Sequence, residues 1–387
     1  DAGLALGTSL VASGKSEDGL EYLQSLRKQH NKDSEVDEAL GDAYRYLLDF
    51  PESSKYYRSS IAKDPKNIES YNKLADLMVE FEKPEEAMHI LQQALQKQPL
   101  NIPLINKLGT VYQELGDYDT AAKQHATARE LNIDDPQGYY QGIVVELQRK
   151  NPEAAKQLYR EIGQKFPDNV DTLYYQAKYD QIAGKKEQAL EKLEEANKRS
   201  PNNSKYVYEL GLLYLLFEDF IQAMSLFKEV IGIEPQNINP YIEIGRGHLE
   251  QNNPAGAKEY FQKASELRPY KKKPYLMLGK TYQSTQENNR AIQSYEKVLQ
   301  IDPQNEEANF QLGNIYIDAG RAEQGLSYLI QTTKKNPNNS EAFLKLGYAY
   351  KDANQQDDAI KAFQKFLELT PDSPHAQVVK DEIQNLQ

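Results

Sequence analysis

The chain has 387 residues, no cysteine and a formal net charge of -12. The lack of cysteine excludes disulfides and thiolate metal sites, and the negative charge disfavours nucleic acid or an anionic membrane surface as partners. Apolar runs stay short of the roughly 20 residues that span a bilayer, so we expect a soluble segment without direct membrane insertion. The sequence does not distinguish the cytoplasm from the periplasm. Because it begins at Asp1, we expect a cut segment or a mature product.

A period of thirty-four residues runs through the chain, and a proline closes most of the repeats. Proline cannot continue a helix interior, so each one indicates the end of a helical unit. Ile133 interrupts the series once. The closing prolines are Pro65, Pro99, Pro167, Pro201, Pro235, Pro269, Pro303, Pro337 and Pro371.

Each repeat reads as two short amphipathic helices, as residues 340–373 illustrate. Asn354 lies between the two helices and is suited to the left-handed conformation that ends the first. Such a hairpin cannot bury its apolar face alone and needs a copy on each side. Apolar or small residues share a face at Phe343, Leu346, Gly347 and Tyr350 in the first helix and at Ala359, Phe363 and Phe366 in the second.

The repeated pattern resembles the tetratricopeptide repeat family over nearly the whole chain. This resemblance implies a right-handed superhelix of antiparallel helix pairs whose first helices line a concave groove. We therefore expect an all-α, right-handed α-solenoid superhelix of about eleven helix-turn-helix repeats over residues 1–373, followed by a C-terminal solvating helix at 374–387. The signature is most complete in Tyr275, Leu278, Gly279, Tyr282, Ala291, Tyr295 and Pro303.

In chain order, residues 1–33 form a weak first repeat without its aromatic residues, and residues 34–135 are ordinary repeats. Residues 136–203 are predicted to be irregular, because Glu146 and Asp180 stand where the pattern places an aromatic ring. An unpaired buried carboxylate is costly. Either the helices slip by one residue, which restores Gly142 to the usual glycine place, or these carboxylates meet water or a partner.

From residue 204 to 373 the repeats are regular, and asparagines follow the closing prolines. Asn203, Asn237, Asn305 and Asn339 are placed to cap the next helix. The helix at 374–387 is expected to cover the exposed end of the array.

No arrangement of residues points to catalysis. The five histidines lack metal-ligand spacing, and phosphate loops, nucleophile elbows and zinc-protease motifs are missing from the sequence. We therefore expect no catalytic, cofactor-binding or metal-binding residues and no enzymatic activity.

The groove positions of the first helices change character along the chain. They are polar in the early repeats and apolar from about the fifth, and the stretch 210–217 is apolar throughout although the core needs only one face. A surplus apolar stripe favours a binding site, whereas a tightly wound superhelix would pack the stripe on its own neighbours. The predicted partner-binding residues are Tyr140, Tyr174, Tyr208, Leu212, Leu215, Leu216, Ile242 and Leu249.

The sequence therefore favours a non-enzymatic scaffold or adaptor that binds a partner peptide or helix with apolar anchors in its groove. The alternative is the recognition arm of a larger enzyme, or of a bacterial secretion, pilus or polysaccharide-export assembly, whose active part lies outside this chain. The carboxylate clamp of chaperone-binding family members is missing, because Phe310 occupies the lysine position beside Asn314.

Overall fold

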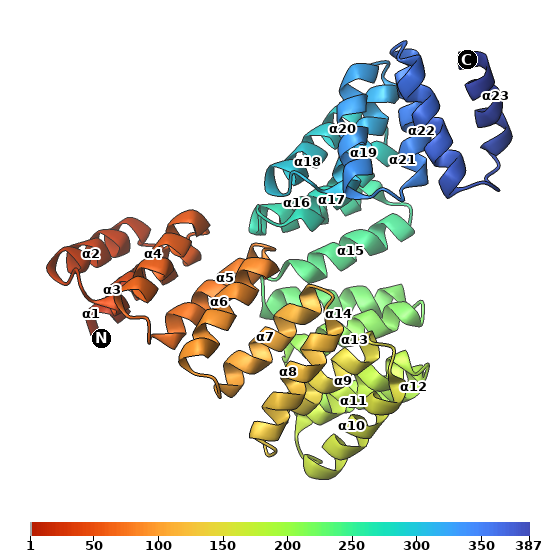
Figure 1. Ribbon diagram of the computed structural model, residues 1–387. Coiled ribbons are helices and arrows are strands. Elements are labelled where there is room, and N and C mark those ends of the chain that lie inside the picture. The colour runs from red at the N-terminus through yellow and green to blue at the C-terminus, as the bar shows by residue number, and fades with distance from the viewer. Residues whose placement is uncertain (1) are drawn as a thin grey trace. The chain divides into compact units, whose positions relative to one another are not determined.

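The computed structural model describes residues 2–387, and every regular element in that range is a helix (Figure 1). The helices divide between two compact parts, residues 1–213 and residues 214–387, called here the N-terminal and C-terminal parts. The helices that lie in the N-terminal part are α1 Ala2–Ala12, α2 Ser16–Gln29, α3 Ser34–Tyr46, α4 Phe50–Lys63, α5 Ile68–Glu80, α6 Pro84–Lys97, α7 Ile102–Glu114, α8 Tyr118–Leu131, α9 Gln137–Gln148, α10 Pro152–Lys165, α11 Val170–Ile182 and α12 Lys186–Arg199.

The boundary between the parts falls inside α13, which runs Ser204–Leu216. The last helix, α23, packs against α22 and covers the end of the C-terminal part. The helices of this part are α14 Phe220–Ile233, α15 Ile238–Glu250, α16 Pro254–Leu267, α17 Lys272–Ser284, α18 Asn288–Ile301, α19 Glu306–Asp318, α20 Ala322–Lys335, α21 Ser340–Asp352, α22 Gln356–Leu369 and α23 Ala376–Leu386.

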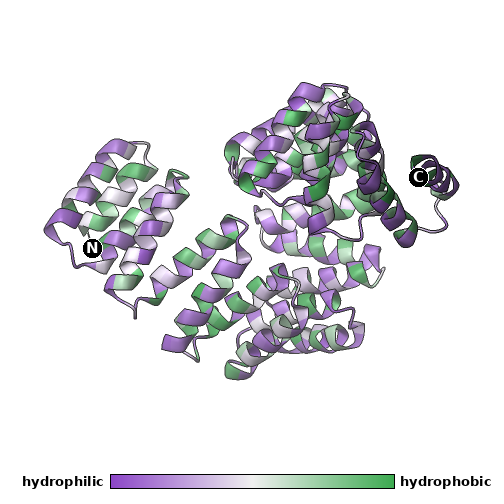
Figure 2. Cartoon of the chain, turned by 45° about the horizontal axis from the view of Figure 1, so that its top comes forward, coloured by the Kyte–Doolittle hydropathy of each residue, from purple (hydrophilic) through white to green (hydrophobic). Residues whose placement is uncertain are grey.

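Within each part, consecutive helices form hairpins, and each second helix packs on the first helix of the next hairpin. The ribbons in Figure 2 show hydrophobic and hydrophilic residues alternating along each helix, as amphipathic helices require. The prediction of an all-α repeat fold with a terminal covering helix is confirmed. None of the helices in residues 2–387 is long and apolar enough to cross a membrane.

The two helices of a hairpin approach each other closely where the first carries glycine. A Cβ atom added to Gly41 would lie 2.5 Å from the Tyr57 ring, and one added to Gly279 would lie 2.6 Å from the Tyr295 ring. Both rings are completely buried. A side chain at these glycines would therefore push the second helix away, which explains why Leu-Gly recurs with the period.

Capping and turn residues follow the sequence expectation. Asn237, Asn305 and Asn339 each accept a backbone N–H at the start of the following helix, and the Asn203 side chain accepts from the Lys205 N–H. Asn354 has a φ of 57° and ends α21 in the left-handed region as predicted. The same place in other hairpins is also left-handed.

The hairpin of α9 and α10 departs from its neighbours. Helix α9 begins after Pro136, which provides no side-chain cap. A Cβ atom on Gly142 would lie 2.9 Å from a methyl carbon of Leu158. These two residues have the same separation in sequence as Gly41 and Tyr57, so the close contact is kept although both have shifted by one place in the repeat.

Candidate functional site

The structure places Tyr140 and Tyr174, on α9 and α11, inside the N-terminal part. Tyr140 is 0% exposed, and its ring stacks on Tyr175 with 4.3 Å between the ring centroids. Its hydroxyl lies 3.2 Å from Oγ1 of Thr172. Tyr140 therefore joins α9 to α11 and offers no surface to a partner, unlike the sequence expectation.

Tyr174 is covered by basic side chains of the same chain. The ammonium of Lys205 lies 4.3 Å from the Tyr174 ring centroid, and the Tyr174 hydroxyl donates to Glu209 at 3.3 Å. Burial, together with the negative charge of Glu209, raises the pKa of Tyr174 well above its usual range. Burial also raises the pKa of Tyr175 to about 12. These phenols stay neutral and act as packing groups.

Lys205 links α13 back to α11 at the same point. Its ammonium lies 2.5 Å from Oδ1 of Asp171, and that oxygen also accepts a hydrogen bond from the Tyr206 hydroxyl at 2.9 Å. A cation over several aromatic faces is stabilised by the ring quadrupoles. Tyr140 and Tyr174 of the predicted stripe are thus used in contacts between successive first helices.

Helix α13 carries the predicted residues that remain accessible. Its buried side comprises Tyr206, Val207, Leu210, Gly211 and Leu213. Tyr208, Leu212 and Leu215 are partly exposed, and Leu216 is 44% exposed.

In the C-terminal part, the two predicted residues lie on α15. Ile242 is 0% exposed and belongs to the core cluster formed with Phe261 and Leu278. Leu249 is partly buried and packs against the same cluster. Ile242 is therefore a core residue, and the sequence expectation of a groove contact does not hold for it.

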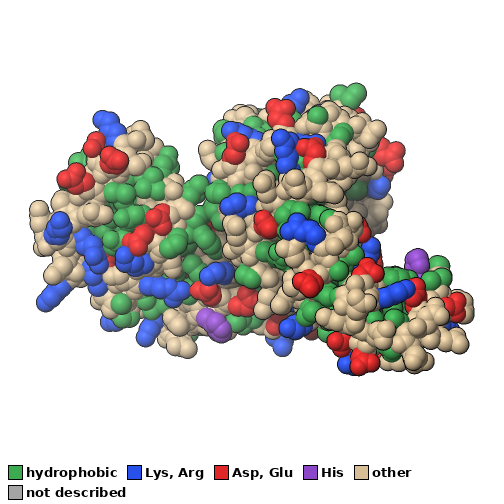
Figure 3. All heavy atoms as spheres, turned by 90° about the horizontal axis from the view of Figure 1, so that it is seen from above, with side chains coloured by type: hydrophobic (Ala, Val, Ile, Leu, Met, Phe, Trp, Pro, Cys, Tyr) green, Lys and Arg blue, Asp and Glu red, His purple; other side chains and the backbone are tan. Residues whose placement is uncertain are grey.

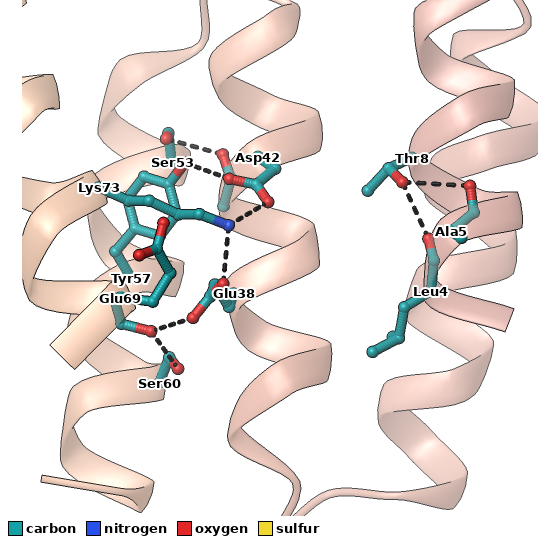
Figure 4. A network of polar contacts seen from close by, with 12 residues as sticks. Leu4, Ala5, Thr8, Glu38, Asp42, Ser53, Tyr57, Ser60, Glu69 and Lys73 are labelled. Atoms are coloured by element: carbon teal, nitrogen blue, oxygen red, sulfur yellow. Dashed lines mark hydrogen bonds and ion pairs between the residues drawn. The ribbon is translucent and has the colours of Figure 1, made fainter. Parts of the chain in front are cut away.

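A polar network joins the first helices of the early repeats (Figure 4). Lys73 of α5 reaches back to α3, where its ammonium lies 2.7 Å from both Glu38 and Asp42. Lys107 of α7 makes the equivalent contact with Asp76 of α5 at 2.9 Å. Burial opposes the charge of Lys73, but hydrogen bonds to Asp42 and Glu38 outweigh it and raise the pKa of this lysine.

Beside this network lies a cavity of about 360 Å³ between α1, α3 and α5. On the face drawn in Figure 3, acidic and basic side chains are interspersed over the surface. The first-helix charges of the polar network, which belong to Glu38, Asp42, Lys73, Asp76 and Lys107, are paired within the chain. The cavity is lined by Leu4, Ala5, Thr8, Glu35, Glu38, Ala39, Asp42, Asn67 and Glu69.

The two acidic residues that break the pattern find partners inside the chain. Asp180 is 0% exposed, and its Oδ2 lies 2.7 Å from the ammonium of Lys192 on α12. Glu146 accepts from Arg149 at 2.8 Å. Sequence reasoning missed Lys192, although it stands where other repeats carry tyrosine. In residues 2–387, no three His, Cys, Asp or Glu side chains converge in a way that could hold a metal ion.

Comparison with known protein families identifies the family of this chain. Tetratricopeptide repeat models match residues 204–237, 284–341 and 341–373. Together with the hairpins, the period and the glycine contacts, these matches show that the chain is a tetratricopeptide repeat protein. A comparison with curated proteins finds no match.

Solved structures are similar to this chain at low sequence identity. The human IFIT1 dimer with PPP-AAAA is 17% identical, with a TM-score of 0.51 over 95% of this chain and 90% of that chain. Yeast Tom70 is 14% identical, with a TM-score of 0.49 over 100% of this chain and 95% of that chain. YrrB, a TPR protein with an unusual peptide-binding site, is 18% identical, with a TM-score of 0.42 over 49% of this chain and 97% of that chain.

Proposed function

We propose that this protein is a non-enzymatic scaffold that holds a peptide or helix of a partner protein against its first helices. The observation that carries the proposal is the surplus of apolar side chains on α13. Leu212, Leu215 and Leu216 are accessible to different degrees, while the core is supplied by other residues of the same helix. Accessible leucines gathered on one helix favour an interaction surface.

The surface proposed here is smaller than the stripe read from the sequence. It comprises Tyr208, Leu212, Leu215 and Leu216. The three leucines lie four, seven and eight residues after Tyr208, and so share one side of α13. Tyr140 and Ile242 are excluded because they are completely buried. Tyr174 is excluded because Lys205 covers its ring.

The proposal is tested by Leu212→Glu, with Leu100→Glu as the matched control. Leu100 is 72% exposed in the turn after α6, so the same change there adds a charge away from the proposed surface. We expect Leu212→Glu to weaken partner capture at least tenfold, which corresponds to about 1.4 kcal/mol. The control should bind normally, and both variants should melt close to the parent chain.

Two results would count against the α13 surface. If Leu212→Glu unfolds the protein, this leucine belongs to the core. If the variant folds and still captures its partner, binding occurs elsewhere, and the polar first helices α3, α5 and α7 become the better candidate.

The alternative function is a recognition arm for an enzyme or an export assembly. The same surface would serve both roles, since each requires the capture of another protein. A partner recovered with an active domain of its own, whose activity depends on Leu212, would favour this alternative.

A further inference from the structure

Second helices reach the next first helix through a recurring polar contact. A glutamine amide on the second helix donates to a tyrosine hydroxyl that lies twenty residues further along the chain. The same separation in each pair shows that the contact belongs to one fixed place of the repeat. The pairs are Gln24 and Tyr44 at 3.3 Å, Gln92 and Tyr112 at 3.0 Å, and Gln262 and Tyr282 at 2.9 Å.

Between α10 and α11 this place is held by Arg160 and Asp180. They are separated by the same twenty residues as the glutamine and tyrosine pairs. Arginine is longer than glutamine and aspartate is shorter than tyrosine, so the two exchanges compensate in length. The register therefore predicts a hydrogen bond between the guanidinium of Arg160 and the carboxylate of Asp180.

The carboxylate of Asp180 has one oxygen that can accept such a bond. The side chain is 0% exposed, and its Oδ2 lies 2.7 Å from the ammonium of Lys192. Within residues 2–387, Oδ1 has no hydrogen-bond partner, and the ammonium of Lys185 lies 3.9 Å away. Buried polar atoms are normally paired, because an unmatched one loses its hydration without compensation. Oδ1 is therefore available to one more donor.

Arg160 is a donor that the described chain does not use elsewhere. Its side chain is exposed and forms no hydrogen bond or ion pair with residues 2–387. Burial raises the pKa of Tyr179, and the positive charge of Arg160 opposes this rise, so the guanidinium lies near that ring. Tyr179 packs against Tyr159 with 4.9 Å between the centroids. Because Arg160 and Asp180 directly follow these tyrosines, α10 and α11 meet at the level of the expected pair.

Two opposing free-energy terms decide whether the pair forms. Closing gives the buried oxygen a charge-assisted hydrogen bond, which is among the stronger kinds. It also takes the guanidinium out of water, and this desolvation offsets much of the gain. Terms that nearly cancel leave two conformations populated together.

We propose that the contact between α10 and α11 is a strap with two states. In the open state, which the structure describes, Arg160 lies in solvent. In the closed state its guanidinium donates to Oδ1 of Asp180 while Lys192 keeps Oδ2. Closing ties the hairpin of α9 and α10 to the hairpin of α11 and α12, and it does not depend on the α13 surface.

The test compares Arg160→Met with Lys228→Met. Lys228 is an exposed base at the same place of α14, and the residue twenty positions later is His248, which offers no carboxylate. Arg160→Met should speed amide hydrogen exchange in α10 and α11 about fivefold, because a closed state four times as populated as the open one protects by that factor. Lys228→Met should leave exchange in α14 and α15 unchanged. Equal effects of the two substitutions would overturn the proposal.

A second background tests whether Asp180 is the partner. The double variant Asp180→Phe with Lys192→Tyr rebuilds an aromatic pair and leaves no acceptor at position 180. Adding Arg160→Met to it should not change exchange in α10. The same fivefold acceleration in this background would show that Arg160 acts through another group, and the proposal would fail.

Nitrogen-15 NMR of the arginine side chains reports the closed state in the parent chain itself. The side-chain N–H groups of Arg160 should exchange with water about fivefold more slowly than those of N-acetyl-argininamide under the same conditions, since the closed state shields them for most of the time. Exchange of Arg160 at the rate of the free amide would mean that the strap stays open, and would also overturn the proposal.

Discussion

At the scale of single residues, Asp180 and Lys192 occupy places where other repeats carry an aromatic pair. Tyr44 stacks on Tyr56 with 5.4 Å between the centroids, and Tyr316 on Tyr328 with 5.7 Å. In the hairpin of α11 and α12 both aromatic residues are replaced together, by an acid and a base that form an ion pair. One substitution without the other would leave a charge or a gap between the helices.

Lys192→Met should therefore destabilise the fold by on the order of 3 kcal/mol, because it leaves Asp180 as a buried charge without its closest partner. Lys185, whose ammonium lies 3.9 Å from Asp180, offers only weak compensation. The double variant Asp180→Tyr with Lys192→Tyr should recover most of the loss by rebuilding the aromatic pair. Urea unfolding measures both effects, and a single variant within about 0.5 kcal/mol of the parent would contradict this account.

Several repeats carry an aromatic ring against the glycine of the first helix. In the hairpin of α7 and α8, the imidazole of His125 takes this place against Gly109 and is completely buried. Burial lowers the pKa of His125 from 6.5 to about 4. The unfolded chain therefore binds a proton at a higher pH than the folded chain does. Above about pH 6.5 the imidazole is neutral in both states and adds no pH dependence.

Between about pH 6.5 and 4, stability should fall as the pH falls, because only the unfolded chain gains this proton. The slope from His125 is at most about 1.4 kcal/mol per pH unit. His125→Phe should remove this part of the slope, while carboxylates add the same acid dependence to both chains. Chemical unfolding of parent and variant at several pH values tests it, and parallel curves would show that the histidine does not titrate as stated.

At the scale of the helical element, a residue with positive φ lies two residues after the last residue of each first helix. Gly116 has a φ of 77°, and no heavy atom beyond its two chain neighbours lies within 4 Å of the place where its Cβ would be. Gly232, inside α14, has equally open surroundings but does not have a positive φ. The two glycines therefore differ in backbone conformation and not in crowding.

Gly116→Ala should cost about 1 kcal/mol of folding free energy, because an L residue is disfavoured in the left-handed region. Gly232→Ala should instead stabilise by roughly 0.5–1 kcal/mol, because alanine loses less backbone entropy in a helix. Thermal unfolding of both variants provides the comparison. Equal shifts of the same sign would mean that the backbone conformation is not the cause.

Helices, caps and turns could be predicted from the sequence because their signals are local. Asn237 and Asn305 follow a closing proline by two residues and cap the next helix, and Asn354 marks its turn. The register also places Tyr140 and Ile242 at groove positions. It does not show how far the neighbouring helix approaches, and that distance decides whether a side chain at such a position is buried.

The candidate site was harder to predict for the same reason. Lys205 reaches the Tyr174 ring from the next first helix, and Lys192 reaches Asp180 from the second helix of the same hairpin. Such contacts depend on side-chain length and on packing between separate elements. The accessible residues of α13 agree with the expected surplus, while their binding of a partner stays a prediction.

At the scale of the whole molecule, stability is distributed along the array. Each hairpin contacts its sequence neighbours within its own part of the chain, so folding free energy is approximately a sum of repeat and neighbour terms. Among residues 2–387, the hairpin of α1 and α2 packs on α3, and its core is small. Leu23 of α2 is completely buried in the N-terminal cluster with Val11 and Leu40.

Leu23→Ala should open the hairpin of α1 and α2 while the distant repeats stay folded. Removing a buried leucine costs about 2–5 kcal/mol, and within residues 2–387 the contacts of α1 and α2 outside their own hairpin are with α3. Hydrogen exchange should then speed up in residues 2–29 and stay unchanged in α17 and α18.

Leu312→Ala is the matched control, since Leu312 is also completely buried but lies in an inner repeat. It should loosen hairpins on both of its sides, from α17 to α22, because each depends on the α19 surface. Uniform loss of protection along the whole chain in Leu23→Ala would mean that the array unfolds as one cooperative unit, and the nearest-neighbour description would fail.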